Sequence, residues 1–341
     1  MNAIHCGSGI KGGNTTFKET LAKGAKPKSS SISCCSTFSK YIFDMRKNST
    51  DDFLDATVLM ANAFNPITNE NEKILALGLL SCEDGKNHRE PLNLIVVLDV
   101  SGSMNEKLSS KNKMTKLDLA KSCLKDMYFK LTEEERIGVI TFNKASNLII
   151  DFKLKKNSTK KEFFSKIDNL KAGGGTSIRV GYDLAVAILK TKIESNIKDD
   201  AKNKEFLSKN NRIIFLTDAL INNKQEADDL FEINYEYSKK PWNIFSTFIG
   251  IGIDFDTDLV TKLTKVRGSN YFAVHTEEEF RKTLQDDFNY IVTPLCFDVF
   301  VNFQSEKYEI QRTFGSEFDF KGSVIRDEER RCSKVGNFEC I

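Results

Sequence analysis

Short hydrophobic runs alternate with helix-spaced hydrophobic residues through the middle of the chain. Leu92–Leu98 (LNLIVVL) ends at Asp99, and residues 212–217 (RIIFLT) end at Asp218. Continuous apolar runs of this length are typical of strands that a parallel sheet buries on both faces. Between them, Lys116–Leu131 places its apolar residues at helical spacing. This part of the chain therefore predicts strands and helices in alternation.

The same alternation continues as far as residue 292. Further strands are predicted at 136–142, 148–152, 243–250 and 271–274, and further helices at 158–170, 178–192, 225–239, 257–266 and 276–291. Ser158 is expected to cap the helix that it begins. Alternation at these lengths favours an open sheet with helices on both faces. We therefore expect residues 91–292 to form a doubly wound α/β domain with a mostly parallel six-stranded sheet.

The flanks of this domain follow a different pattern. Residues 53–64 and 73–82 are strand-like, and residues 295–303 alternate and are rich in Phe and Val. Neither flank holds enough strands to close a sandwich alone. We therefore expect residues 39–90 and 293–320 to form a small β-sandwich in which the α/β domain is inserted.

The two ends of the chain are poor in apolar residues. Residues 1–38 are rich in Gly, Ser, Lys and Thr and are expected to be a disordered arm, and residues 321–341 a tail that is disordered or truncated. The arm has no apolar segment typical of a signal peptide, and no run reaches the roughly 18 apolar residues of a membrane span. We therefore expect a cytoplasmic location without a transmembrane segment, and leave an extracellular one open.

Composition narrows the classes of function. Hydrophobic residues make up 40% of the 341 residues, which is enough for a core and excludes wholesale disorder. The 50 basic and 48 acidic side chains leave a net charge of +2, so we expect no nucleic-acid binding by phosphate neutralisation. The eight cysteines form no C-x-x-C pair and the chain has only three histidines, which argues against a zinc site.

Oxygen-bearing side chains follow the ends of the predicted strands. Asp99, Ser101 and Ser103 stand in DVSGS, Thr176 stands in GGGTS, and Asp218 stands in FLTDA. Because the carboxyl ends of parallel strands share one edge of the sheet, these side chains are expected to converge there. Hydroxyls and carboxylates are hard donors that suit Mg²⁺, with Mn²⁺ or Ca²⁺ as alternatives.

These motifs, together with the AGGGTSI loop and the order of the elements, resemble a von Willebrand factor type A domain with a complete metal-ion-dependent adhesion site. The resemblance covers about 200 residues, and it implies that Ser101, Ser103 and Thr176 are metal ligands and that Asp99 and Asp218 are charged supports. Ala219 departs from the glycine usual in the family after the last aspartate, but it removes no ligand. Family members with the domain inserted in a β-sandwich include integrin β subunits.

The resemblance implies a protein-binding module for adhesion or scaffolding, in which an Asp or Glu of a protein ligand completes the coordination of the metal. We expect no enzymatic activity, because Ser101 stands where a haloacid dehalogenase needs a second Asp and Asp99 where a serine-hydrolase elbow needs Gly. Two alternatives stay open: a subunit of an AAA ATPase or metal-chelatase complex, and a structural domain whose metal site is vestigial.

Overall fold

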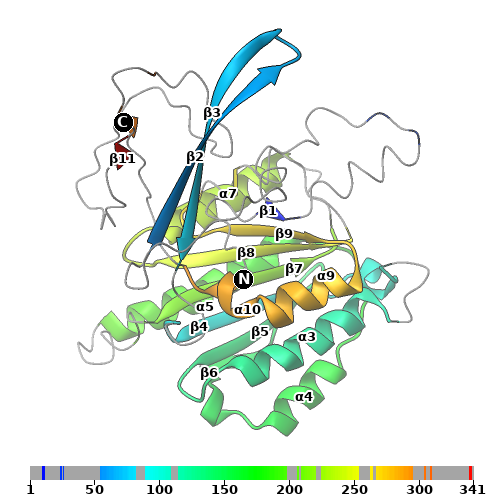
Figure 1. The fold of residues 1–341 in the computed structure, drawn as a ribbon. Helices are drawn as coiled ribbons and strands as arrows, with labels where there is room; N and C mark the ends of the chain where they lie inside the picture. Colours follow the sequence, from blue (N-terminus) through cyan, green and yellow to red (C-terminus); the bar gives the residue numbers. More distant parts are fainter. Residues whose placement is uncertain are drawn as a thin grey trace.

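The structure is a computed structural model that describes residues 10–11, 24, 26, 54–81, 89–108, 114–197, 206, 209–219, 224–252, 262–263, 266–294, 303–304, 308 and 338–339. Within them, an α/β body carries most of the regular structure, and a long β-hairpin stands apart from its sheet (Figure 1). None of the helices in these ranges is both long enough and apolar enough to cross a membrane.

The body is built on one mostly parallel sheet. Its strands are β4 (Leu92–Asp99), β5 (Arg136–Phe142), β6 (Ser146–Leu154), β7 (Asn210–Thr217), β8 (Ile244–Ile251), β9 (Asn270–Val274) and the short β1 (Ile10–Lys11). They lie in the order β1-β9-β8-β7-β4-β5-β6, and only β6 runs antiparallel to its neighbour. The predicted doubly wound sheet of six strands is confirmed. The two residues of β1 extend it at the β9 edge, within the segment predicted to be an arm.

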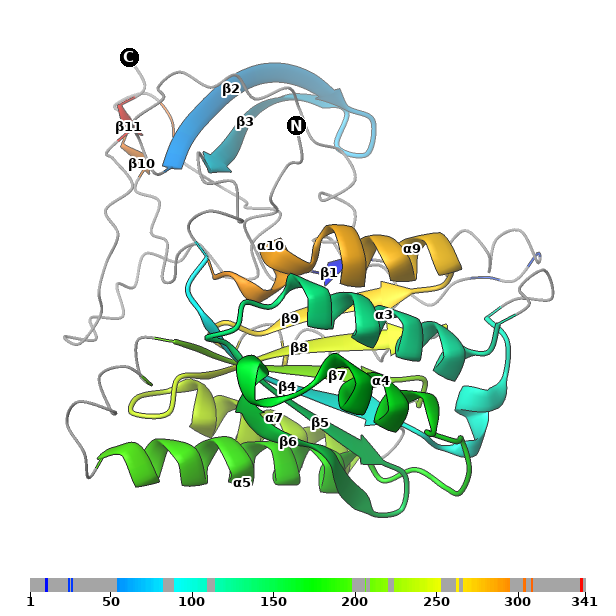
Figure 2. The same ribbon diagram turned by 90° about the horizontal axis from the view of Figure 1, so that it is seen from below.

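Helices cover both faces of this sheet (Figure 2). They are α3 (Lys116–Lys130), α4 (Lys160–Asp168), α5 (Ile178–Ile197), α7 (Lys224–Ser238), α9 (Glu277–Arg281) and α10 (Phe288–Val292), with 3₁₀ turns η2 (Gly102–Asn105) and η3 (Lys155–Asn157). The core packed by α3, α4, α9 and α10 lies on one face, and the core packed by α5 and α7 lies on the other. Successive residues of β4, such as Val96 and Val97, enter opposite cores because side chains of a strand alternate in direction.

Two predicted helices differ in detail from the observed ones. The N-cap of α4 is Thr159, whose hydroxyl accepts a hydrogen bond from the backbone N–H of Glu162, so the prediction of Ser158 was wrong by one residue. The predicted helix 276–291 is α9 and α10 joined by the π-helical turn η4 (Lys282–Asp286). Phe280, Leu284 and Phe288, from before, within and after this wider turn, are all buried in the same core. Of the predicted helix 257–266, only residues 262, 263 and 266 are described.

The flanking hairpin consists of β2 (Leu54–Asn65) and β3 (Glu70–Ser81), which pair antiparallel along their whole length. A turn joins them in which the side chain of Asn65 accepts a hydrogen bond from the backbone of Ile67, and Asn69 adopts a φ of 59°. Lys73 Nζ lies 2.5 Å from the hydroxyl of Tyr308. The other described strands of the C-terminal part are β10 (Phe303–Gln304) and β11 (Phe338–Glu339), which pair with each other. The sandwich therefore stays a prediction.

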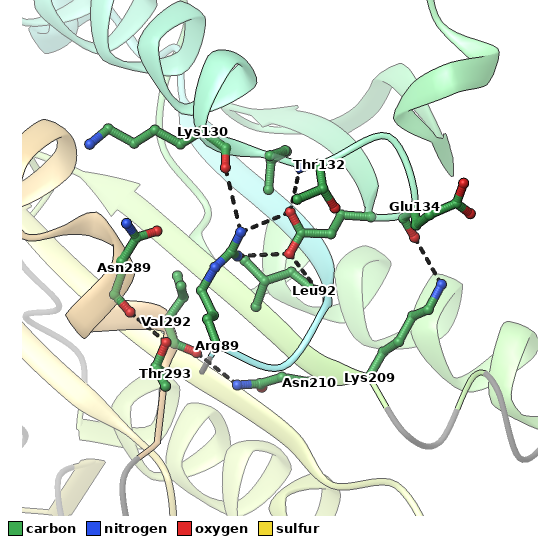
Figure 3. A network of polar contacts seen from close by, with 12 residues as sticks. Arg89, Leu92, Lys130, Thr132, Glu134, Lys209, Asn210, Asn289, Val292 and Thr293 are labelled. Atoms are coloured by element: carbon green, nitrogen blue, oxygen red, sulfur yellow. Dashed lines mark hydrogen bonds and ion pairs between the residues drawn. The ribbon is translucent and has the colours of Figure 1, made fainter. Parts of the chain in front are cut away.

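A buried ion pair joins the segment that enters the body to the turn between α3 and β5 (Figure 3). Arg89 Nη1 lies 2.8 Å from Oε1 of Glu135, and both side chains are nearly inaccessible to solvent. The same carboxylate accepts hydrogen bonds from the backbone N–H groups of Leu92 and Thr132. Close by, Asn210 donates to the backbone carbonyl of Val292, at the end of α10. These contacts hold the entry and the exit of the body together, at the edge opposite the carboxyl ends of the strands.

Candidate metal-ion site

The five predicted site residues stand at the carboxyl edge of the sheet. Asp99 is the last residue of β4, Ser101 and Ser103 lie in the turn that follows it, and Asp218 comes directly after β7. Because β4 and β7 are neighbours and parallel, their ends reach the same level. Asp99, Ser101 and Asp218 are buried, whereas Thr176, in the loop before α5, is exposed.

Direct hydrogen bonds join the two serines to the distant aspartate. Ser101 Oγ and Ser103 Oγ are 3.1 Å apart, and the Ser103 hydroxyl donates to Oδ1 of Asp218 at 2.8 Å. The structure therefore brings together side chains that are 115 positions apart in the sequence. Their oxygens face one another across the ends of two neighbouring strands.

Asp99 is held in place from two sides. Its Oδ1 accepts from the backbone N–H of Ser101 at 2.7 Å, and its Oδ2 accepts from the hydroxyl of Thr217 at 2.6 Å. Burial raises the pKa of this carboxyl above its ordinary value, and the negative charge of Asp218 adds to the rise. The hydrogen bonds from Thr217 and Ser101 oppose the shift. A positive charge in the site would favour the ionised form, so the buried carboxyl suits the support of a cation.

The loop of Thr176 is tied to the serine turn through the backbone. Gly102 donates to the carbonyl of Gly174 at 3.1 Å, and Gly173 donates to the carbonyl of Val100 at 2.8 Å. Gly174 has a φ of 84°, which disfavours any residue with a side chain, and an added Cβ would lie 3.2 Å from Nδ2 of Asn143. Among the described residues, the Thr176 hydroxyl has no hydrogen-bond partner. The backbone of the loop is therefore held beside the serine turn, whereas among the described residues the Thr176 hydroxyl makes no hydrogen bond to the serines or the aspartates.

Three residues of the site were not predicted from the sequence. Thr217 orients Asp99, and Asn143 donates through Nδ2 to the carbonyl of Gly173 at 3.1 Å. Lys116, the first residue of α3, places Nζ 2.7 Å from Oδ2 of Asp218. A signal for Lys116 was present, because it falls at helical spacing with the apolar residues Ala120 and Leu124 and so lies on the buried face of the helix.

The donor set fits a hard divalent cation. It consists of two carboxylates and three hydroxyls, which suit Mg²⁺, Mn²⁺ or Ca²⁺ and supply no nitrogen or sulfur ligand. Among the described residues no cluster of three or more His, Cys, Asp or Glu side chains is present, so a metal site of the histidine–thiolate kind is absent from this part of the chain. A cation bound here would depend on the hydroxyls of Ser101, Ser103 and Thr176.

The middle of the chain matches the model of a known family. Residues 94–220, which include all five site residues, match the family model of the von Willebrand factor type A domain. This match supports a von Willebrand factor type A domain in this part of the chain. Such domains mediate protein–protein interaction, and they are often metal-dependent adhesion or scaffold modules.

Two curated relatives match part of this chain. Escherichia coli YfbK, named an uncharacterized protein, is 26% identical over 234 residues, which is 68% of this chain and 36% of that protein. The Synechocystis protein sll0103, also named uncharacterized, is 30% identical over 116 residues, or 34% of this chain and 25% of that protein. The chain thus spans about a third or less of the length of these relatives.

Solved structures with a similar trace include one named as a von Willebrand factor type A protein. That protein, from Catenulispora acidiphila, is 15% identical and covers 73% of this chain and 51% of its own, with a TM-score of 0.47. The PilB minor pilin of Streptococcus sanguinis is 13% identical and covers 70% and 78%, with a TM-score of 0.44. Proximal thread matrix protein 1 of the mussel byssus, solved with zinc in its adhesion-site motif, is 19% identical and covers 60% and 48%, with a TM-score of 0.38.

Proposed function

We propose that this protein is a metal-dependent protein-binding module of the adhesion or scaffold kind. In this proposal Ser101, Ser103 and Thr176 hold a divalent cation, and Asp99 and Asp218 support it by charge. The observation that carries the proposal is the hydrogen-bonded series from Ser101 through Ser103 to Asp218, which joins the ends of two strands. Mg²⁺ is the proposed resident ion because all the donors are hard oxygens.

Coordination arithmetic supports an acidic protein ligand. A divalent cation accepts about six or more donors. This site offers five side chains, and two of them, Asp99 and Asp218, are proposed to support the ion by charge without binding it directly. At least one position is therefore left for an outside group. A carboxylate from an Asp or Glu of a partner protein supplies both the missing oxygen and a negative charge, which makes it the best match for the vacant position.

The same geometry supports binding without catalysis. Ser103 donates its hydroxyl proton to Asp218, and the two serine hydroxyls lie against each other. Within the part of the chain that the structure describes, neither hydroxyl bonds to a histidine that would activate it as a nucleophile. Asp99 is engaged by two hydrogen-bond donors. We therefore assign the five residues to holding a cation and assign none of them a catalytic step.

The metal arm of the proposal is tested by isothermal titration calorimetry of the full chain with Mg²⁺. We expect wild type to bind one ion at high micromolar to millimolar strength. The double variant Ser101→Ala/Ser103→Ala should give no heat of binding, because two hydroxyl ligands are removed. Ser165→Ala, at an exposed position of α4, is the matched control and should behave as wild type. Absence of Mg²⁺ and Mn²⁺ binding by folded wild type would overturn the proposal.

The ligand arm is tested by affinity purification in Mg²⁺ and in EDTA. Proteins that bind through the site should be recovered in Mg²⁺ and lost both in EDTA and with Ser101→Ala/Ser103→Ala. Replacing the contacting Asp or Glu of a recovered partner with Asn or Gln should abolish its binding. Recovery that is unchanged by EDTA and by the double variant would refute metal-dependent binding. Recovery of an ATPase as the main metal-dependent partner would favour the ATPase-subunit alternative over adhesion.

A further inference from the structure

Lys116, the first residue of α3, brings a positive charge into the site. Thr115 caps this helix in a capping box with Asp118, which fixes the direction of the first turn. Lys116 Nζ then lies 2.7 Å from Oδ2 of Asp218, with only 10% of the lysine side chain and none of the aspartate side chain exposed. Such an ion pair between nearly inaccessible groups is little weakened by solvent.

Packing around Lys116 holds the charge where it is. Gly252 directly follows β8 and packs against the aliphatic part of the Lys116 side chain. A Cβ added at Gly252 would lie 3.6 Å from Cε of Lys116 and 3.2 Å from Cδ2 of Leu108. The second acidic partner, Glu106, lies 3.3 Å from Nζ but has 70% of its side chain exposed. Asp218 is therefore the partner that decides the electrostatics of Lys116.

The ion pair leaves the hydroxyl side of the site untouched. Lys116 binds Oδ2 of Asp218, whereas Oδ1 accepts the hydrogen bond from Ser103. The two oxygens of one carboxylate thus serve the lysine and the proposed cation separately. Lys116 can keep its place when a cation is held beside Ser101 and Ser103.

We propose that Lys116 is a fixed counter-cation that sets the charge of the metal-ion site and through it the demand for an anionic ligand. This inference rests on the proposed function. With Asp99 and Asp218 ionised, the lysine leaves the site with one net negative charge, and a divalent cation turns this into one net positive charge. Without the lysine, the loaded site would be neutral. Lys116 therefore weakens the hold on the cation and leaves the loaded site in need of a negative charge.

The test compares Lys116→Met, which keeps the unbranched side chain but for its last atom and removes the charge, with Lys116→Arg, which keeps the charge. Lys125→Met, on an outer face of the same helix, is the matched control. We expect Lys116→Met to bind Mn²⁺ roughly tenfold more tightly than wild type, and Tb³⁺ roughly thirtyfold more tightly, because the repulsion that is removed grows with the charge of the ion. Lys116→Arg and Lys125→Met should bind both ions within about twofold of wild type.

Stability in EDTA supplies the second measurement. Without metal, Lys116→Met should lower the midpoint of thermal unfolding, because Asp218 loses its counter-charge while it stays buried. Adding Asp218→Asn to Lys116→Met should restore the midpoint, since the unpaired charge is then gone. If Lys116→Met needs metal to fold, stability in EDTA is measured on Lys116→Met/Asp218→Asn, and Tb³⁺ is titrated into Lys116→Met that was refolded in Mn²⁺.

The outcomes separate this inference from the proposed function. Unchanged or weaker Mn²⁺ and Tb³⁺ binding by Lys116→Met, with wild type binding normally, would overturn the role of Lys116 and leave the metal site standing. Equal gains for Mn²⁺ and Tb³⁺ would also overturn it, because a charge effect must grow with the charge of the ion. Failure of wild type to bind any of these ions would refute the proposed function itself.

Discussion

Thr217 and Asp99 join two strands of the sheet at the site: the hydroxyl of Thr217 donates a 2.6 Å hydrogen bond to Oδ2 of Asp99. The register of β4 and β7 explains the contact, because Leu98 pairs with Leu216 and the next residues of the two strands are Asp99 and Thr217. Thr217 also accepts a hydrogen bond from the backbone N–H of Ala219. One hydroxyl thus orients the carboxylate of one loop and the start of another.

Thr217→Val tests this role, because it removes the hydroxyl and keeps the shape. We expect the free energy of unfolding to fall by about 1–2 kcal/mol, since the Asp99 carboxylate loses a buried donor. Mg²⁺ affinity should fall roughly tenfold, because the carboxylate is no longer oriented toward the serines. Thr217→Ser, which keeps the hydroxyl, should retain the affinity. Equal Mg²⁺ affinity in wild type and Thr217→Val, measured by calorimetry, would contradict this role.

Asp99→Asn should separate stability from metal binding. Because burial raises the pKa of Asp99 in the folded protein, its charge opposes folding of the metal-free form. The contribution of Asp99 to stability therefore falls as pH rises from its unfolded pKa through its folded pKa. In EDTA at pH 7, Asp99→Asn should be as stable as wild type or more stable in urea unfolding.

Mg²⁺ provides the contrast for the same variant. It should stabilise wild type and leave Asp99→Asn unchanged, because a ligand stabilises only the protein that binds it. A variant that is markedly less stable than wild type in EDTA would show that the Asp99 charge supports the fold instead of opposing it. Stabilisation of both proteins by Mg²⁺ would show that Asp99 is dispensable for the ion.

The order of the elements could be predicted, and five candidate site residues could be proposed, because each leaves a local mark in the sequence. Apolar runs that stop at Asp99 and Asp218 mark buried strands and the edge where loops converge. The buried face of α3 is a signal for Lys116, but its partner Asp218 lies 102 positions away and leaves no local mark beside it in the sequence. The π-helical turn η4 was missed because periodicity alone does not separate it from a continuous helix.

Gly181 is predicted to be intolerant of a side chain where α5 crosses the sheet. A Cβ at this position would lie 2.9 Å from ring atoms of Phe142 and 2.9 Å from Cγ1 of Val97. Gly181→Ala gains up to about 1 kcal/mol of helix propensity but forces this packing apart at a cost of about 1–3 kcal/mol. We expect a net loss of stability in urea unfolding. The opposite change at an exposed position, Ala187→Gly, should also destabilise, by propensity alone. A more stable Gly181→Ala would show that the helix moves freely on the sheet.

Glu135 and Glu134 are neighbours with opposite surroundings. Glu135 is buried against Arg89, whereas Glu134 forms an exposed pair with Lys156. Glu135→Gln should lower the free energy of unfolding by about 3–5 kcal/mol, because it leaves the buried guanidinium without its counter-charge. Glu134→Gln should change it by less than about 0.5 kcal/mol. Chemical denaturation of the two variants measures both, and equal effects would contradict the burial of the Arg89–Glu135 pair.

Cys123 should be unreactive in the folded protein. It lies on the buried face of α3, and burial raises the pKa of its thiol to about 12, although the charge of Arg281 lowers the pKa in part. Since the thiolate is the nucleophile, almost none of the reactive form is present at pH 8. Maleimide treatment of the native protein, followed by peptide mapping, should leave the Cys123 peptide unlabelled, whereas treatment in guanidinium should label it fully. The native labelling rate then reports how often α3 leaves the sheet. Native labelling as fast as in denaturant would show that α3 is not packed as described. It would then also contradict the position of Lys116, the first residue of α3.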